Sequence, residues 1–286
     1  MSLEGKRVLI LEGGGFKTSY TAGILDAFTM TNYFEFDAIV AVSGGSLAAS
    51  YYLSGQFGSY FNSMRTIVKD PRFISFSKAF SEGLMNLDFF YDIAEKEFPF
   101  DFEKAVNKMK LCHFYIVLTD SESGKTVYIQ PNQSNWIDLT IAASTVPMLT
   151  KGRHPFEGKE YSDGGISNPI PIEWTVEQNP KSVLLIRTTH HNFTPSFIKP
   201  EYFVAKLIRA SEHIKSQVEN FQINIKKAID FVNTYKGPTR IEQLAPEKDL
   251  KTNIFTNSVD SIVLDYRNGL DDGLKFVFQK RNSSRD

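Results

Sequence analysis

Near the start of the chain, two short apolar runs each end at glycines and are followed by a stretch with helical spacing. Residues 7–11 lead into three consecutive glycines, and residues 20–30 then place apolar side chains three to four positions apart. The unit repeats at once, with a continuous apolar run at residues 38–42, two glycines, and a small-residue helix predicted over residues 46–53. Two successive units of strand, turn and helix predict strands that lie parallel in one sheet.

The rest of the chain predicts a mixed sheet with further helices around it. Further strands are predicted at residues 114–119, 126–129, 159–161, 183–188 and 240–244. Glycine-containing hairpin turns at residues 123–124 and 157–158 indicate that some of these strands pair antiparallel. Residues 204–235 predict one long or two abutting amphipathic helices, and residues 258–279 predict a closing helix. Because no internal repeat or linker-like segment is present, we expect residues 1–286 to form a single α/β domain.

Residues 57–102 differ in texture from the rest of the chain. They hold ten of the 24 phenylalanines, interspersed with serine, lysine and aspartate and without a strand period. Two interpretations stay open: a helical segment whose aromatic rings pack on the sheet, or a lid whose rings line a hollow for a fatty-acyl chain. Residues 200–286 are expected to add helices and one strand to the same core.

Charge and cysteine content narrow the function classes. The 286 residues carry 32 basic and 33 acidic side chains, a net charge of −1, so no basic excess indicates a nucleic-acid partner. The single Cys112 excludes an intramolecular disulfide, and no Cys/His group has zinc spacing, so we expect no metal and no cofactor. The apolar run at residues 8–11 is shorter than the ~7 to 15 residues of a signal-peptide core, and no stretch reaches the ~18 apolar residues of a membrane span. We therefore expect a cytoplasmic protein whose membrane contact is peripheral at most.

The strongest chemical signal is Ala41-Val42-Ser43-Gly44-Gly45, at the turn from the second predicted strand into a helix. This context is typical of a nucleophile elbow, in which the turn lifts a serine out of the sheet and the following helix directs N–H groups at developing negative charge. The usual pattern is G-x-S-x-G, and Ala41 replaces its first glycine, so we expect its methyl group to crowd the turn slightly. A glycine- and serine-rich turn without chemistry is the alternative.

A second glycine-rich turn, from Glu12 to Thr18, ends the first predicted strand and opens the next helix. A dinucleotide fingerprint requires a third glycine at Thr18, and a P-loop requires glycines at Leu11 and Phe16, so both nucleotide-binding motifs fail. What remains is a run of backbone N–H groups able to hold an oxyanion. On adjacent parallel strands, we expect this loop to lie beside Ser43.

A third glycine-rich strand end, from Tyr161 to Gly165, contains Asp163. A serine nucleophile requires a base, which is normally a histidine. His190 follows a predicted strand, and a triad of Ser43, Asp163 and His190 has the chain order usual for α/β-hydrolases. In the alternative, Asp163 contacts Ser43 directly, and burial must then raise the pKa of Asp163 above its reference value of about 3.9. Both arrangements stay open on the residues alone.

These three elements together resemble the patatin-like phospholipase family, most closely its bacterial branch of stand-alone esterases. The family combines a G-G-G-x-R/K-G loop, a G-x-S-x-G elbow and a D-G-G or D-G-A turn, which correspond here to residues 13–18, the Ser43 turn and residues 163–165. Residues 142–147 and 166–171 also match the A-S-x-x-x-P and N-P-x-P stretches of the family.

The resemblance covers roughly residues 6–188 and implies a three-layer α/β/α sandwich with a mostly parallel central sheet. It implies a catalytic dyad of Ser43 and Asp163 without histidine, which hydrolyses acyl esters of lipids or phospholipids. It also implies an oxyanion hole built from the glycine loop and the elbow, namely Gly13, Gly14, Gly15 and Gly44.

The chain departs from the family pattern at two positions. Thr18 stands where the family has a glycine and Ala41 where it has the first elbow glycine, and both are expected to narrow the site or lower activity. Lys17 matches the basic position of the family, either as a solvated surface lysine or as a group that holds the loop or meets a head-group phosphate. Two other functions stay as alternatives: a nucleotide-binding module that uses residues 13–18, and a catalytically silent lipid- or partner-binding protein on the same scaffold. The sequence indicates no oligomeric state.

Overall fold

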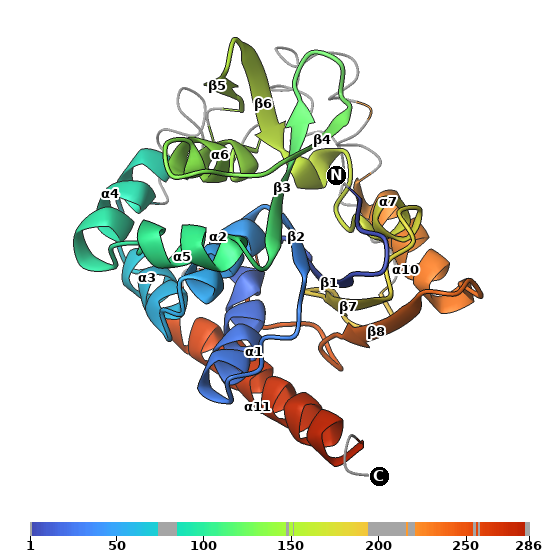
Figure 1. The fold of residues 1–286 in the computed structure, drawn as a ribbon. Helices are drawn as coiled ribbons and strands as arrows, with labels where there is room; N and C mark the ends of the chain where they lie inside the picture. Colours follow the sequence, from blue (N-terminus) through green and yellow to red (C-terminus); the bar gives the residue numbers. More distant parts are fainter. Residues whose placement is uncertain are drawn as a thin grey trace.

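The computed structural model describes residues 2–73, 85–146, 149–150, 152–193, 216, 221–253, 256 and 258–283. Its strands are β1 (Arg7–Leu11), β2 (Ala38–Val42), β3 (His113–Asp120), β4 (Thr126–Ile129), β5 (His154–Phe156), β6 (Lys159–Asp163), β7 (Ser182–Ile186) and β8 (Arg240–Leu244). Its helices are α1 (Thr18–Met30), α2 (Gly44–Leu53), α3 (Ser59–Ile67), α4 (Leu87–Glu97), α5 (Phe102–Met109), α6 (Trp136–Ala143), α7 (Ile172–Val176), α10 (Phe221–Thr234) and α11 (Val259–Ser283), with short 3-10 turns η1 (Gly15–Lys17) and η3 (Gly164–Ile166) (Figure 1).

The described strands form one mixed sheet of eight strands, in which hydrogen-bonded neighbours follow the order β5-β6-β3-β2-β1-β7-β8 and β4 also pairs with β3. Strands β3, β2, β1, β7 and β8 run parallel, whereas β4 and β6 are antiparallel to β3 and β5 is antiparallel to β6. The predicted parallel units and the two predicted hairpins are therefore confirmed. The predicted turn at residues 157–158 precedes β6 as expected, but β5 before it is not predicted as a strand, because its three residues include a proline and form no apolar run.

Alternate residues of the central strands face opposite sides of the sheet, which gives the molecule three layers. Leu9 and Leu11 of β1 lie in a core cluster with residues of α1, α2 and α11. Val8 and Ile10 lie in a second cluster with residues of α7 and α10. Figure 1 shows the helices of the first cluster on one side of the central strands and α7 and α10 on the other. The expected α/β/α sandwich with a mostly parallel sheet is therefore confirmed.

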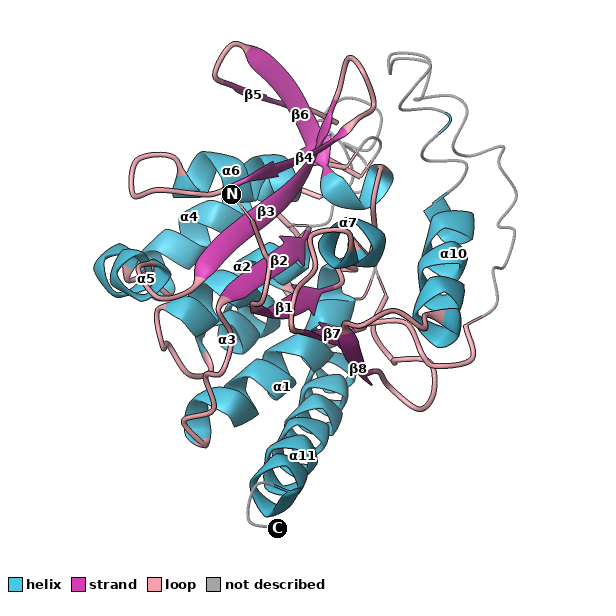
Figure 2. Ribbon diagram, turned by 45° about the vertical axis from the view of Figure 1, so that its right-hand side comes forward, coloured by secondary structure: helices cyan, strands magenta, loops and turns pink. Residues whose placement is uncertain are grey.

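Helix α11 packs along α1 at close range. A Cβ atom at Gly23 would lie 2.1 Å from Tyr266 O, and a Cβ atom at Gly269 would lie 2.0 Å from Tyr20 O. Only glycine permits these approaches, since protein interiors are close-packed. Figure 2 shows the two helices side by side beneath the sheet. The contact ties the C-terminal helix to the first helix of the chain.

The C-terminal third of the chain adds β8, α10 and α11 to the same core. The predicted closing helix corresponds to α11, which begins one residue later and continues to Ser283. Within residues 204–235, the structure describes residue 216 and α10, and the other predicted helical residues before α10 lie outside the described part. Throughout the described ranges, no helix combines the length and the apolarity needed to cross a membrane.

The phenylalanine-rich segment at residues 57–102 contributes α3, α4 and the start of α5, and its residues 74–84 lie outside the described part. Phe73 packs edge-on against Phe16, with ring centroids 5.8 Å apart, and lies 6.2 Å from the ring of Phe90. All three rings are buried. The described aromatic side chains therefore support the interpretation that this segment packs on the core, and the lid interpretation stays a prediction.

Candidate active site

Ser43 occupies a strained turn between β2 and α2. Its φ of 54° and ψ of −133° place it in a backbone region that non-glycine residues seldom adopt. The turn is closed by Ser46, whose N–H donates to Ser43 O at 2.8 Å and whose hydroxyl donates to Ala41 O at 3.1 Å. The Ser43 side chain does not cap α2, and the methyl group of Ala41 is buried in the core cluster on the α1 and α2 side. The Ser43 hydroxyl thus remains available for contacts at the edge of the sheet.

The register of β3 brings Asp163 to Ser43. Val117 of β3 pairs with Val42 of β2 on one edge and with β4 on the other. The next residue, Leu118, again pairs with β4, but its other partner is Asp163 of β6. Strands β2 and β6 therefore share one edge of β3 and meet head to head. As a result, Ser43, which follows the last residue of β2, faces Asp163, the last residue of β6.

The Asp163 carboxyl group is buried and two polar groups face it. One is the Ser43 hydroxyl, which favours the ionised form, and the other is the Gly165 N–H, which donates to Asp163 Oδ1 at 2.7 Å. The Asp163 backbone is also held, because its N–H donates to Thr145 O and its carbonyl accepts from Thr119 Oγ1, both at 2.8 Å. Burial raises the pKa of Asp163 to about 6, against the opposing effect of the Ser43 hydroxyl and the Gly165 N–H. The group is therefore mainly a carboxylate at neutral pH and a stronger base than an exposed aspartate.

The glycine after Asp163 lets β6 end in close contact with β3. A Cβ atom at Gly164 would lie 2.2 Å from Val117 O, which is closer than any side chain can approach. The chain then turns into η3, and this turn returns the Gly165 N–H to the carboxyl group. The glycines of this motif therefore seat Asp163 against β3 and orient its carboxyl group.

The glycine loop after β1 lies directly beside Ser43. A Cβ atom at Gly13 would lie 2.7 Å from Ser43 Cβ, so only glycine fits at this approach. Gly14 has a φ of 137°, which favours glycine, and its carbonyl accepts from Lys17 N at 3.1 Å as η1 begins. Within the described part of the chain, no acceptor binds the N–H groups of the two turns at Gly14, Gly15 and Gly44. Unpaired donors beside a hydroxyl are suited to holding an anion.

Thr18, which stands where the resembled family has a glycine, is fully buried. Its hydroxyl donates to Gly15 O at 2.6 Å and, because that uses its single hydrogen, accepts from Tyr60 OH at 2.6 Å. The same hydroxyl would lie 3.0 Å from a Cβ atom at Gly44. Thr18 thus connects the glycine loop and the elbow with α3, and its side chain is committed to these scaffold contacts.

Two threonines after β7, which the sequence reasoning does not single out, hold the other flank of the glycine loop. The N–H groups of Thr188 and Thr189 donate to Glu12 Oε2 at 2.8 Å and 3.2 Å. The Thr188 hydroxyl donates to Gly13 O at 2.6 Å, and the Thr189 hydroxyl donates to Glu12 Oε2 at 2.9 Å. All three side chains are buried. The sequence feature that could have identified these two threonines is their position directly after an apolar strand, at the same end of the parallel strands as the glycine turns.

The described part of the molecule places no histidine against Ser43 or Asp163. His190, the candidate third member of a triad, instead has its Nε2 3.5 Å from Asp249 Oδ1 and its ring beside Phe193. His213 lies outside the described residues. In the ranges that are described, no group of three or more His, Cys, Asp or Glu side chains is placed to hold a metal ion.

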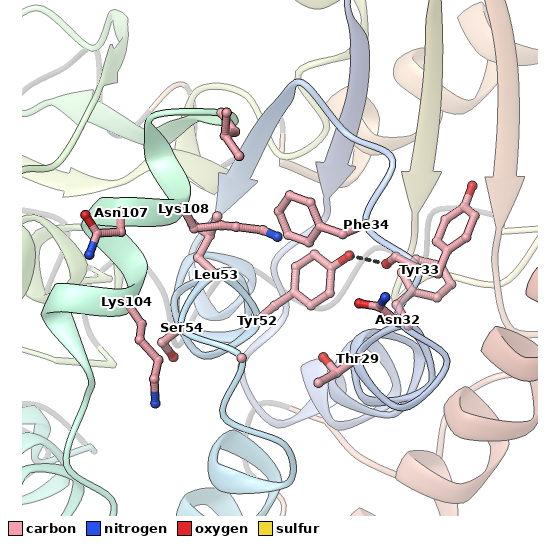
Figure 3. A pocket seen from close by; sticks show the side chains of 13 residues that line it. Thr29, Asn32, Tyr33, Phe34, Tyr52, Leu53, Ser54, Lys104, Asn107 and Lys108 are labelled. Atoms are coloured by element: carbon pink, nitrogen blue, oxygen red, sulfur yellow. Dashed lines mark hydrogen bonds between the residues drawn. The ribbon is translucent and has the colours of Figure 1, made fainter.

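A hollow of about 430 Å³ (Figure 3) lies near the start of β2, at the other end of this strand from Ser43. Its lining includes Phe34 and Tyr52, whose rings stack with centroids 5.0 Å apart, and Lys108, whose Nζ lies 3.6 Å from the centre of the Phe34 ring. Phe34 precedes β2, whereas Ser43 follows it. This hollow is therefore separate from the candidate active site.

Similarity to known proteins is found at the level of a family model, of a sequence relative and of a solved structure. A family model described as patatin-like phospholipase matches residues 9–175, which include the glycine loop, Ser43 and Asp163. A protein of Escherichia coli (strain K12), described as uncharacterized protein YjjU, is 25% identical over 276 residues, which cover 93% of this chain and 75% of the relative. Among solved structures, the crystal structure of VipD from Legionella pneumophila is similar, with 11% sequence identity and a TM-score of 0.47, over 97% of this chain and 68% of VipD.

Proposed function

The chain belongs to the patatin-like phospholipase family, and from this we propose that it hydrolyses fatty-acyl esters of lipids, with Ser43 as nucleophile and Asp163 as its base. The observation that carries the proposal is that the register of β3 sets a hydroxyl in a strained turn against a buried carboxyl group. A serine hydroxyl is a weak nucleophile unless a neighbouring base accepts its proton. In the described part of the chain, Asp163 is the titratable group in contact with Ser43.

In the first half of the proposed reaction, the Asp163 carboxylate accepts the hydroxyl proton as Ser43 Oγ attacks the ester carbonyl carbon. The negative charge that develops on the carbonyl oxygen is held by the unpaired N–H groups of the two turns, namely Gly14, Gly15 and Gly44. Gly13 allows the loop to approach Ser43 closely enough for this. The tetrahedral intermediate then breaks its bond to the alcohol, which leaves with the proton from Asp163, and the fatty-acyl group remains on Ser43.

In the second half, water replaces the alcohol. Asp163 accepts a proton from water as the water oxygen attacks the acyl carbon, and the same N–H groups hold the second oxyanion. Ser43 Oγ leaves and takes the proton back from Asp163, and the fatty acid is released. The pKa of about 6 suits both halves, since Asp163 is ionised at neutral pH and still accepts a proton readily.

The proposed nucleophile is tested by trapping. We expect a fluorophosphonate probe to label the wild-type protein on Ser43 and to leave the Ser43→Ala variant unlabelled, because the probe reacts with an activated serine. We expect Ser43→Ala to abolish turnover of p-nitrophenyl esters of fatty acids as well. Mass spectrometry of the labelled peptide identifies the site. A folded wild-type protein that is neither labelled nor active would instead select the catalytically silent lipid-binding function.

The proposed base is tested by comparing two variants. We expect Asp163→Asn to lose ester turnover and His190→Ala to retain it, because Asp163 contacts Ser43 and the His190 ring is directed to Asp249. Turnover that survives in Asp163→Asn and is lost in His190→Ala would replace the dyad with another arrangement. Profiles of p-nitrophenyl ester chain length and of phospholipid head group then define the lipid class.

A further inference from the structure

The glycine loop after β1 is bordered by two different strands. In the sheet, β1 lies between β2 and β7, so the end of β2 with Ser43 flanks the loop on one side and the end of β7 flanks it on the other. The β7 side carries Thr188, whose side chain is 1% exposed. Its hydroxyl donates to the carbonyl oxygen of Gly13 at 2.6 Å.

This hydrogen bond determines the direction of the next N–H group along the loop. In a trans peptide, the carbonyl of one residue and the N–H of the following residue point in opposite directions, and the described chain contains no cis peptide bond. Since the Gly13 carbonyl is directed at Thr188 on the β7 side, the Gly14 N–H is directed away from β7, toward the β2 side that carries Ser43. We propose that Thr188 is a positioning residue, which orients the Gly14 N–H as an oxyanion donor; the inference rests on the proposed function.

Thr188 is itself held in place, so its hydroxyl can act as a fixed support. Its N–H donates to Glu12 Oε2 at 2.8 Å, and the same carboxylate oxygen accepts from the N–H and the hydroxyl of Thr189. A Cβ atom at Gly14 would lie 2.9 Å from Thr188 Oγ1, so the hydroxyl is in close contact with the loop. Without this support, Gly14 has the backbone freedom of glycine, and its peptide plane can rotate.

The role is tested with Thr188→Val, which removes the hydroxyl and keeps the branched shape. We expect kcat for p-nitrophenyl esters to fall about tenfold to a hundredfold, because an oxyanion donor that is badly oriented loses much of its effect. KM is expected to change by about twofold at most, since the donor acts on the transition state. Thr188→Ser, which restores the hydroxyl, is expected to recover most of kcat.

The matched control is Thr239→Val. Thr239 is also buried, and its hydroxyl donates to Pro180 O at 3.0 Å. Thr239 directly precedes β8 and Pro180 lies before β7, so this pair lies at the other end of the parallel strands from Ser43. We expect this variant to lose stability to a similar extent, as measured by thermal unfolding, and to keep its kcat. Equal kcat values in Thr188→Val and Thr239→Val would overturn the proposal.

A second readout separates orientation of the donor from a merely structural role. A trifluoromethyl ketone forms a covalent bond with Ser43 Oγ and places an oxyanion in the hole, so its inhibition constant is expected to rise by the same factor by which kcat/KM falls in Thr188→Val. If Thr188→Val does not fold, the comparison is made between Thr188→Ser and Thr188→Ala. In that case equal activities of the serine and alanine variants would overturn the proposal. A wild-type protein that no fluorophosphonate labels would show instead that the proposed function fails.

Discussion

Asp163 and Asp26 are two buried carboxyl groups whose pKa values are both raised to about 6 by burial. Asp163 lies at the end of β6 against the Ser43 hydroxyl and one N–H group. Asp26 lies in α1, where both of its oxygens accept from Gly58 N–H, at 3.0 Å and 3.2 Å, and one also accepts from the Tyr266 hydroxyl at 2.9 Å. The two groups share burial and the direction of the pKa shift, and they differ in the partners that face them.

A raised pKa marks burial, whereas the partner group decides what a carboxyl group can do. The donors at Asp26 join three helices, because α1 carries the carboxyl group, Gly58 directly precedes α3 and Tyr266 lies in α11. The hydroxyl that faces Asp163 is that of Ser43, which has a φ of 54° and lies beside unpaired N–H groups. Asp26 therefore connects three helices of the scaffold, whereas Asp163 has the neighbouring groups that a reaction site requires.

Neutralising each carboxyl group in turn is expected to have the largest effect. We expect Asp163→Asn to lower kcat/KM for p-nitrophenyl esters by about 10³-fold or more and Asp26→Asn to leave it within about twofold, since only Asp163 contacts the proposed nucleophile. Steady-state kinetics of both variants, after circular dichroism has shown that they are folded, provide the measurement. An equal loss in the two variants would mean that burial of charge, and not the Ser43 contact, governs activity.

The two carboxyl groups are also expected to differ in their effect on the pH dependence of activity. If Asp163 must be ionised to accept a proton, we expect kcat/KM to rise about tenfold per pH unit in acid and to level off above a pKa of about 6. Asp26→Asn is expected to keep this rising limb unchanged, although it removes a group with the same pKa. Rates measured from pH 4.5 to 8.5 in buffers of about constant ionic strength test it. Loss of the limb in Asp26→Asn would assign it to the wrong carboxyl group.

Stability as a function of pH gives the next largest effect. The pKa of Asp163 is raised from 3.8 to about 6, so the folded protein binds the proton more tightly than the unfolded chain does. Ionisation of Asp163 therefore lowers the stability above pH 6, and this penalty disappears as the pH falls through 6 toward 3.8. We expect Asp163→Asn to raise the free energy of unfolding by about 1 to 3 kcal/mol at pH 8 and to give no gain near pH 4.

Urea unfolding of Asp163→Asn and wild-type protein at the two pH values measures this difference. Asp26→Asn serves as the matched variant and is expected to show the same pH trend, because its pKa shift has the same direction and cause. If Asp163→Asn is more stable but inactive, and Asp26→Asn is more stable and active, the buried charge of Asp163 is retained for chemistry. A loss of stability in Asp163→Asn at pH 8 would contradict this.

The smallest effect is expected from Tyr266→Phe, which removes one donor to Asp26 and keeps the ring stacked on Phe61, 3.9 Å between centroids. The Tyr266 hydroxyl lowers the pKa of Asp26, so its loss raises that pKa further. We expect a cost of about 1 kcal/mol at pH 8, where Asp26 is ionised, and a smaller cost at pH 5. Ester turnover is expected to stay unchanged. A selective loss of kcat would contradict this and would show that the Asp26 contacts influence the candidate active site.

Much of the fold follows from local sequence patterns. The strands β1 and β2 are continuous apolar runs that end at glycines, and these features locate both turns to the residue. β6 is harder to bound, because its last residues, Ser162 and Asp163, are polar and are included only through backbone pairing with β3. β7 ends at Ile186, two residues before the predicted end, where the chain leaves the ladder to hold the glycine loop.

The candidate site is predictable as a set of residue types but not as an arrangement. Glycine turns after three strands indicate one edge of the sheet, whereas the contact between Ser43 and Asp163 depends on the register of β3, which pairs with β2 and then with β6 along one edge. No local pattern encodes that register. The support by Thr188 has the same origin, since a hydroxyl 175 residues from Gly13 reaches it only through the order of the strands.

The head-to-head meeting of β2 and β6 on one edge of β3 also has a consequence for the newly made chain. On the ribosome, Ser43 and its turn emerge long before residues 159–163 have been synthesised. Until that late strand docks, the Ser43 hydroxyl has no carboxyl partner. On the proposed function, the nascent polypeptide is therefore inactive toward lipid esters until the central sheet is complete.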